Sequence, residues 1–193
     1  RGVWAVCLLA TACVDTGAGR VSTRVVVQGT DATAPFEVRD GWRVELHRAE
    51  LAFGGLTLCP GVQAGDLCEE ARAEVETAVR IDALDPMPRE AAQMPALAAT
   101  VRSAMWNYGV RWSLTSPAPI VDEAAADGSV VLEGVASRAT DAGDEVLPFR
   151  ANLTIEPGAP GVIVVRAARL FEHDIREGDA LRVEVDPRAW ISD

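Results

Sequence analysis

Residues 147–156, Leu147-Pro-Phe-Arg-Ala-Asn-Leu-Thr-Ile-Glu156, place an apolar side chain at every odd position and a proline or polar side chain at every even one. A period of two is typical of a β-strand with one buried face. The stretch 181–186 repeats the pattern, with apolar side chains at Leu181, Val183 and Val185. These two stretches predict the clearest strands and indicate a β-rich fold.

The same alternation continues through much of the chain. Between Leu46 and Ala49 the apolar side chains change from even to odd positions, so we expect a β-bulge or a strand break near Arg48. Turn-forming residues separate the predicted strands, for example at Asp127-Gly128. The further predicted strands cover residues 25–27, 42–46, 49–53, 106–114, 130–136 and 162–170.

One stretch departs from this period. Apolar side chains recur at helical spacing from Leu67 to Arg80, and Asp66 is suited to cap a helix there. The end of the stretch, from Val79 to Ala83, also alternates and could be a strand instead. Prolines in residues 85–89 and at Met94-Pro95 then predict an irregular connection, because proline cannot donate a backbone hydrogen bond.

Together these elements predict a mostly β protein. The expected architecture is an antiparallel β-sandwich of the immunoglobulin-like or transthyretin-like kind, with one or two short helices. Residues 22–193 are expected to form a single domain, since no linker or internal repeat is visible. An apolar residue near the end, Ile191, is compatible with a clipped C-terminus.

The first thirteen residues carry one positive charge at Arg1, then an uncharged apolar run, small residues and Cys13. This order is typical of a secretory signal. The run is much shorter than the ~20 apolar residues that a membrane-spanning helix needs. The hexapeptide Leu8-Leu-Ala-Thr-Ala-Cys13 resembles the lipobox of bacterial lipoproteins, although Ala10 replaces the usual leucine.

The lipobox resemblance implies that residues 1–12 are a cleaved signal peptide and that Cys13 carries acyl chains such as palmitate. Residues 13–21 would then be a tether, and the protein would be a membrane-anchored lipoprotein of the cell envelope, facing the periplasm or the cell surface. Both the inner and the outer membrane are compatible destinations. The alternative is a buried N-terminal strand that happens to end in cysteine.

The charge balance argues against nucleic acid as a partner. The chain has 18 basic residues, all of them arginine, and 29 acidic residues, for a formal net charge of −11. Such a chain repels phosphate backbones, and no basic patch with interleaved aromatic residues is present. The absence of lysine also excludes Schiff-base chemistry on a lysine side chain.

Four cysteines fall into separate classes. Cys7 lies in the expected signal peptide, and Cys13 is the predicted lipid site. Cys59 and Cys68 remain as a pair, which we expect to form a disulfide in an exported protein. A metal or redox pair is the alternative, but the spacing does not match CxxC.

The two histidines are the strongest metal candidates. His47 and His173 could bind copper or zinc together with Glu172, provided that the fold brings them together. His173 followed by Asp174 could also serve as a base and its orienting group beside a nucleophile. Exposed strand or turn positions are the simpler interpretation of both histidines, and we expect no bound cofactor.

Aromatic residues supply a second candidate site. Trp106, Tyr108 and Trp112 would share one face of a strand and could stack on a sugar or an aliphatic ligand. The simpler interpretation is that they belong to the core.

Acidic groups are the third candidate. Asp141, Asp144 and Glu145 could provide oxygen ligands for calcium, although a solvated hairpin tip is the simpler interpretation. Asp82 and Asp85 form a smaller acidic pair. Two carboxylates could also serve a glycosidase if the fold placed them across a cleft.

No catalytic motif is present: HExxH and GxSxG are both absent. The leading hypothesis is therefore a non-catalytic binding or interaction module of the cell envelope. Its partner would be a protein, a glycan or a small molecule, held by loops on a rigid β scaffold. The alternatives are a periplasmic copper or zinc protein and a hydrolase without a recognisable motif.

Overall fold

The structure is a computed structural model that describes residues 19–61, 71–108, 110–111, 118–119, 128–154 and 166–191. Most of these residues lie in β-strands, which confirms the mostly β prediction. Helical geometry within the described residues is limited to two short 3-10 turns, η1 (Arg39–Gly41) and η2 (Pro187–Trp190). The strands are β1 (Arg20–Gln28), β2 (Phe36–Glu37), β3 (Arg43–Cys59), β4 (Ala73–Asp82), β5 (Arg89–Leu97), β6 (Thr100–Asn107), β7 (Val110–Arg111), β8 (Ala118–Pro119), β9 (Val130–Thr140), β10 (Gly143–Leu153), β11 (Arg166–Asp174) and β12 (Ala180–Glu184).

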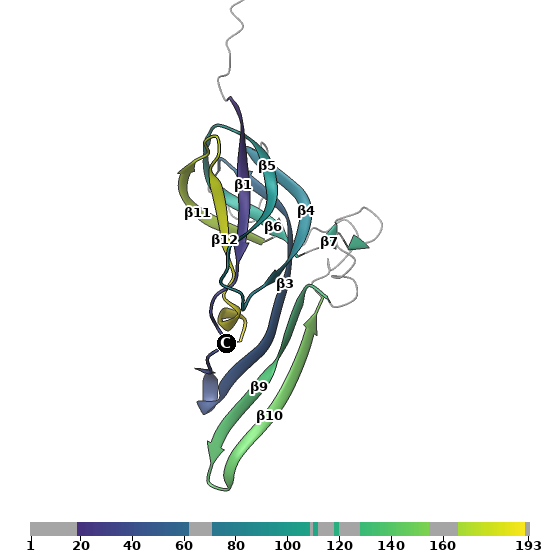
Figure 1. Cartoon of the computed structure of the whole chain (residues 1–193), viewed down its shortest axis with the longest axis vertical. Coiled ribbons are helices and arrows are strands. Elements are labelled where there is room, and N and C mark those ends of the chain that lie inside the picture. The colour runs from purple at the N-terminus through teal and green to yellow at the C-terminus, as the bar shows by residue number, and fades with distance from the viewer. Residues whose placement is uncertain are drawn as a thin grey trace, which may run out of the picture.

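Ten of these strands form one curled, mixed sheet (Figure 1). Its main path runs β10-β9-β3-β4-β5-β1-β12, while β6 pairs with β3 and β11 pairs with β6. Nearly all neighbours are antiparallel, as expected, but β12 lies parallel to β1. The pair β7 and β8 forms a separate two-stranded sheet.

Strand β3 is continuous over 17 residues and contains the expected bulge. Leu46 lies opposite Gly134 of β9 and Arg48 lies opposite Glu133, so His47 is the extra residue. The bulge explains why the apolar positions change from even to odd without a strand break. A Cβ at Gly134 would lie 2.3 Å from the carbonyl oxygen of Glu45, so the backbones approach too closely there for any other residue.

Strand β3 also joins two parts of the molecule. Its first half, residues 43–51, pairs with β9, and on the same edge its second half pairs with β6 from Gly54 onward. The strand bends at a second bulge, where Gly55 has a φ of 57° that favours glycine. We call residues 43–51 with β2, β9 and β10 the arm, and the remaining strands of the curled sheet the body; Figure 1 shows the arm extending away from the body.

The core is a single apolar cluster that includes residues of both arm and body. Several of its most buried members lie on strands that have a neighbour on each side, as Val27 does on β1 and Leu58 on β3. Trp190 of η2 packs against the same cluster. Arm and body therefore share one apolar core as well as one continuous strand.

The helix expected from Leu67 to Arg80 is wrong over its described part, because residues 73–82 form β4. These residues pair with β3, for example Ile81 opposite Leu51 and Val79 opposite Phe53. Alternation at the end of the stretch and the gain from cross-strand pairing outweigh the weak helical spacing.

Two other boundaries differ from expectation. The loop at residues 85–88 is irregular as predicted, but Met94-Pro95 lies inside β5, where Pro95 is opposite Ser22 of β1. Pairing between β5 and β4 is limited to one position, so β5 has a largely open side on which a proline is tolerated. Of the strand expected at 106–114, the described residues place 106–107 at the end of β6 and 110–111 in β7, and the strand expected at 162–170 is described from Arg166 to Asp174.

Candidate functional site

A candidate site lies where the hairpin of β4 and β5 opens. The two strands pair at Ala73 and Ala96, near the end remote from their connecting loop, and this is their one ladder position in the described residues. Toward the loop, the guanidinium of Arg89 donates to the carbonyl oxygen of Arg80. A side chain thus takes the place of a ladder bond, and the strands stay apart.

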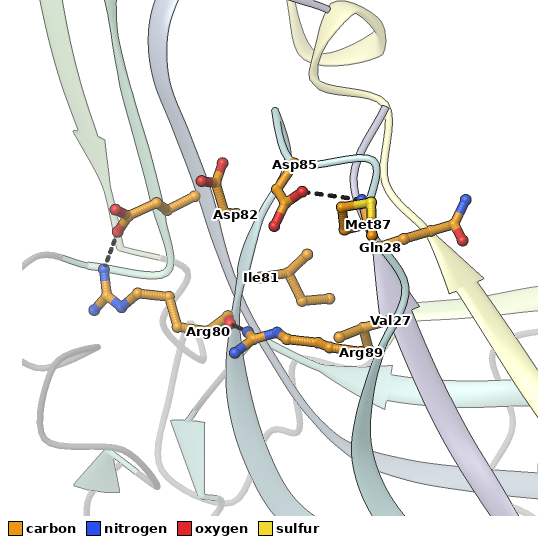
Figure 2. A pocket seen from close by; sticks show the side chains of 9 residues that line it. Val27, Gln28, Arg80, Ile81, Asp82, Asp85, Met87 and Arg89 are labelled. Carbon is orange, nitrogen blue, oxygen red and sulfur yellow. Dashed lines mark hydrogen bonds and ion pairs between the residues drawn. The ribbon is translucent and has the colours of Figure 1, made fainter. Parts of the chain in front are cut away.

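A pocket of about 300 Å³ fills this opening (Figure 2). That volume is at the lower end of the range for small-molecule sites. Most of its polar groups are charged, and the core strands supply its floor. The lining residues are Val27, Gln28, Glu50, Arg80, Ile81, Asp82, Asp85, Met87 and Arg89.

The loop fixes the two acidic side chains at the pocket. An oxygen of Asp82 accepts a hydrogen bond from the backbone N–H of Leu84 at 2.9 Å. Asp85 accepts from the backbone N–H of Met87 at the same distance. Figure 2 shows both carboxylates on one side of Ile81 and the Arg89 guanidinium on the other. The pocket therefore has an acidic side and a basic side.

A charge network borders the pocket on β3. Arg48 donates to both oxygens of Glu50, at 2.8 and 3.0 Å, and Arg80 donates to Glu50 at 2.6 Å. Glu133 of the arm accepts from Arg48 at 3.2 Å and lies 3.5 Å from Arg150. The hydrogen bonds from Arg48 and then Arg80 hold the pKa of Glu50 below its usual value of 4.5, and those from Glu50 and Glu133 raise the pKa of Arg48.

The histidines are not gathered into a metal site. His47 lies 3.2 Å from Glu45 at the β3 bulge, while His173 on β11 lies 3.8 Å from Asp179. Glu172 is paired instead with Arg102, at 3.4 Å. In the part of the chain that the structure describes, no group of three or more His, Cys, Asp and Glu side chains could hold a metal ion.

Asp174, the proposed orienting group for His173, is also bound to other residues. Asp174 accepts a hydrogen bond from the hydroxyl of Thr100 at 2.6 Å and lies 3.8 Å from Arg176. The structure therefore does not support a base at His173 oriented by Asp174.

The aromatic residues follow their simpler interpretation where they are described. Trp106 and Tyr108 are half-buried and pack against the core, and the ring of Trp106 lies 6.4 Å from that of Phe53. Trp112 lies outside the described residues. Trp42 carries the guanidinium of Arg138 over its ring at 4.6 Å.

The acidic turn is a hairpin tip. Asp141 and Asp144 are exposed at the connection between β9 and β10, and Glu145 binds Arg138 at 2.8 Å. One of the three proposed calcium ligands is thus already paired with a cation.

Several predicted features lie outside the described residues, namely the signal peptide, the lipid site Cys13 and Cys68. Cys59 is described: it is buried at the end of β3, 5 % exposed. Its pairing with Cys68 stays a prediction. Within the described ranges, no helix has the length and apolar character needed to span a bilayer.

Sequence reasoning found part of the pocket. Asp82 and Asp85 stood out as an acidic pair, but Glu50, Arg80 and Arg89 did not. The signal available was the proline-rich loop at 85–88, which forces the two flanking strands to begin apart. Glu50 comes from a strand that is remote in sequence, and only the pairing of Glu50 with Asp82 across β3 and β4 brings it there.

Comparison with known proteins gives no assignment: no protein-family model matches the chain, and no curated protein or solved structure matches it either.

Proposed function

We propose that this protein is a non-catalytic binding module of the cell envelope that holds a small charged molecule in the pocket between β4 and β5. The single observation that carries the proposal is the pocket itself, with carboxylates and a guanidinium fixed on opposite sides of one opening. Fixed, partly enclosed charges bind a complementary ligand without the reorganisation that flexible surface groups need.

The pocket is suited to binding rather than to turnover. Its described lining has no serine, cysteine or histidine that could act as nucleophile or base. Its Asp82 and Asp85 carboxylates accept hydrogen bonds from backbone N–H groups of the loop, which hold them in place for binding.

The location belongs to the same proposal. The lipobox resemblance at Leu8–Cys13 supports cleavage before Cys13 and acylation of its sulfur. The tether would end before Arg20 rather than at residue 21 as expected, because Arg20 and Val21 of β1 pair with β5, and the domain would face the periplasm or the cell surface. We also propose that the body is a sandwich of the immunoglobulin-like or transthyretin-like kind, which its curled sheet around one core supports.

The ligand test uses the full chain extracted from its native membrane. A panel of amines, amino acids, carboxylates and sugar acids is measured by thermal shift and calorimetry. We expect at least one class to bind, Arg89→Gln or Asp85→Asn to weaken it, and the ligand to be recovered unchanged. Arg102→Gln is the matched control, because Arg102 is equally exposed and its ion pair with Glu172 is not part of the pocket.

Two results would overturn this part: no compound of the panel binds, or binding is unaffected by both pocket variants. The anchor has its own test. Metabolic labelling with an alkynyl fatty acid should label the wild-type protein but not Cys13→Ser, and labelling of both or of neither contradicts the lipoprotein proposal.

A further inference from the structure

The charges that line the pocket can be counted against one another. Glu50, Asp82 and Asp85 are acidic, while Arg80 and Arg89 are basic. Arg80 lies 2.6 Å from Glu50, which Arg48 also binds, and Arg48 in turn binds Glu133. Arg48, Arg80, Glu50 and Glu133 thus form a network with two charges of each sign. Two carboxylates and one guanidinium remain to meet a ligand.

These three groups are capable of further hydrogen bonds. Each of Asp82 and Asp85 uses one oxygen for a loop N–H group, and a carboxylate has about four acceptor sites. Arg89 uses one N–H for the carbonyl oxygen of Arg80, and a guanidinium has five. A ligand can therefore bind all three groups without breaking the contacts that position them.

The pocket also offers apolar surface to a ligand. Ile81 and Val27 lie at its floor, and Met87 in the loop is 70 % exposed, with its side chain at the pocket. Methionine is flexible and adapts to irregular apolar partners. A ligand with an aliphatic stem between its charged groups would cover this thioether, which the protein alone leaves in water.

We infer that the ligand is a free basic amino acid, with two ammonium groups for Asp82 and Asp85, one carboxylate for Arg89 and a methylene chain against Met87. This inference rests on the proposed function of the same pocket. It adds the ligand class. The two carboxylates disfavour dicarboxylates and sugar acids, and the Arg89 guanidinium favours an amino acid over a simple diamine, which has no carboxylate to bind it.

The experiment compares L-lysine with three analogues that each lack one group. Cadaverine lacks the carboxylate, 6-aminohexanoate lacks the α-ammonium and L-norleucine lacks the side-chain ammonium. Calorimetry with the membrane-extracted full chain should give the lowest Kd for L-lysine. Each analogue should bind about tenfold or more weakly, because a hydrogen bond between charged groups is lost.

Variants assign each group to its partner. Arg89→Gln should weaken the binding of L-lysine but leave the binding of cadaverine unchanged, so that the two ligands bind with similar Kd. Asp85→Asn and Asp82→Asn should each weaken the binding of both L-lysine and cadaverine, whereas Arg102→Gln should change the binding of neither. All these positions are exposed, so the variants should keep the wild-type melting temperature.

The outcomes separate this inference from the proposed function. If cadaverine, 6-aminohexanoate or L-norleucine binds as tightly as L-lysine, or if a carboxylate or sugar acid binds instead, the basic amino acid is wrong and the binding module stands. If no compound binds, both fail. If L-lysine binds but the three pocket variants do not affect it, the site is elsewhere and both proposals fail for this pocket.

Discussion

Arg48 and Glu50 lie two residues apart on β3 and form a two-bond ion pair, with Nε at 2.8 Å and Nη2 at 3.0 Å from the carboxylate oxygens. Residues at this spacing share one face of a strand. The pair lies where β3 leaves the arm and enters the body, and it is extended by Glu133 on one side and by Arg80 on the other. The Arg48–Glu50 pair thus connects β3, β4 and β9 at the junction.

The first prediction concerns the removal of that carboxylate. Glu50→Gln should lower the free energy of unfolding by about 1–3 kcal/mol, because charged hydrogen bonds to two half-buried arginines are lost. Urea unfolding at neutral pH measures the change. Glu172→Gln is the control, since its pair with Arg102 is exposed and should contribute less than about 1 kcal/mol. Equal effects in the two variants would contradict the special role of the junction.

The second prediction is a pH dependence. The pKa of Glu50 is lower in the folded protein than its ordinary 4.5, so the unfolded state binds the proton more readily. Its contribution is therefore complete above the unfolded pKa and is lost as the pH falls through the folded pKa. The difference in unfolding free energy between wild type and Glu50→Gln should be constant from pH 7 to about 5.5 and should shrink below about 4.5. A difference that is independent of pH down to acid unfolding would refute the assignment.

The third prediction concerns the bulge in the arm. Gly134→Ala should destabilise the protein by about 1–3 kcal/mol, because the new Cβ would lie 2.3 Å from a backbone oxygen that cannot move aside freely. Gly61→Ala is the control, since nothing lies within 4 Å of a Cβ there. Chemical unfolding of the two variants measures both. An alanine tolerated equally at the two positions would show that the arm strands can separate without cost.

The fourth prediction concerns the outer edge of β10, beside which the described residues place no further strand. The carbonyl of Leu153 accepts from Ser129 beside β9, and pairing along β10 continues without a register shift. Odd-numbered residues therefore direct their backbone groups to β9 and even-numbered ones to the open edge, where Pro148 offers no N–H. Pro148→Val restores this donor and should promote edge-to-edge association.

Sedimentation velocity over a concentration series measures that association. Arg150→Val is the matched control, because it adds the same side chain to the same edge but no new N–H group. We expect concentration-dependent oligomers of Pro148→Val only. If Pro148→Val sediments as the wild type does, the proline does not protect this edge.

The period-two pattern was sufficient for β1, β3, β9, β10 and β12, because each strand of a half-buried sheet must alternate, but it did not predict β5 or the first part of β6. It even located the bulge, since the change of phase after Leu46 has a local cause in His47. It could not show that β12 would lie parallel to β1, because parallel and antiparallel neighbours need the same alternation.

The pocket shows the other limit of sequence reasoning. Asp82 and Asp85 are close in sequence and were recognisable as a pair, whereas Glu50 joins them through a ladder between strands that begin 30 residues apart. The helix expected at residues 67–80 was wrong for a related reason. The apolar spacing of this stretch fits a helix in isolation, and pairing with β3 makes the strand at residues 73–82 more stable.

The unbroken course of β3 has a mechanical consequence. A force applied at the far end of the arm would act along the length of β3 and load its ladder with β4 in shear, so many hydrogen bonds would have to rupture together. The outer strand β10 has β9 alone beside it in the described sheet and could be peeled away one bond at a time. Under force on the arm, β10 should therefore separate from β9 at a lower force than β3 separates from β4.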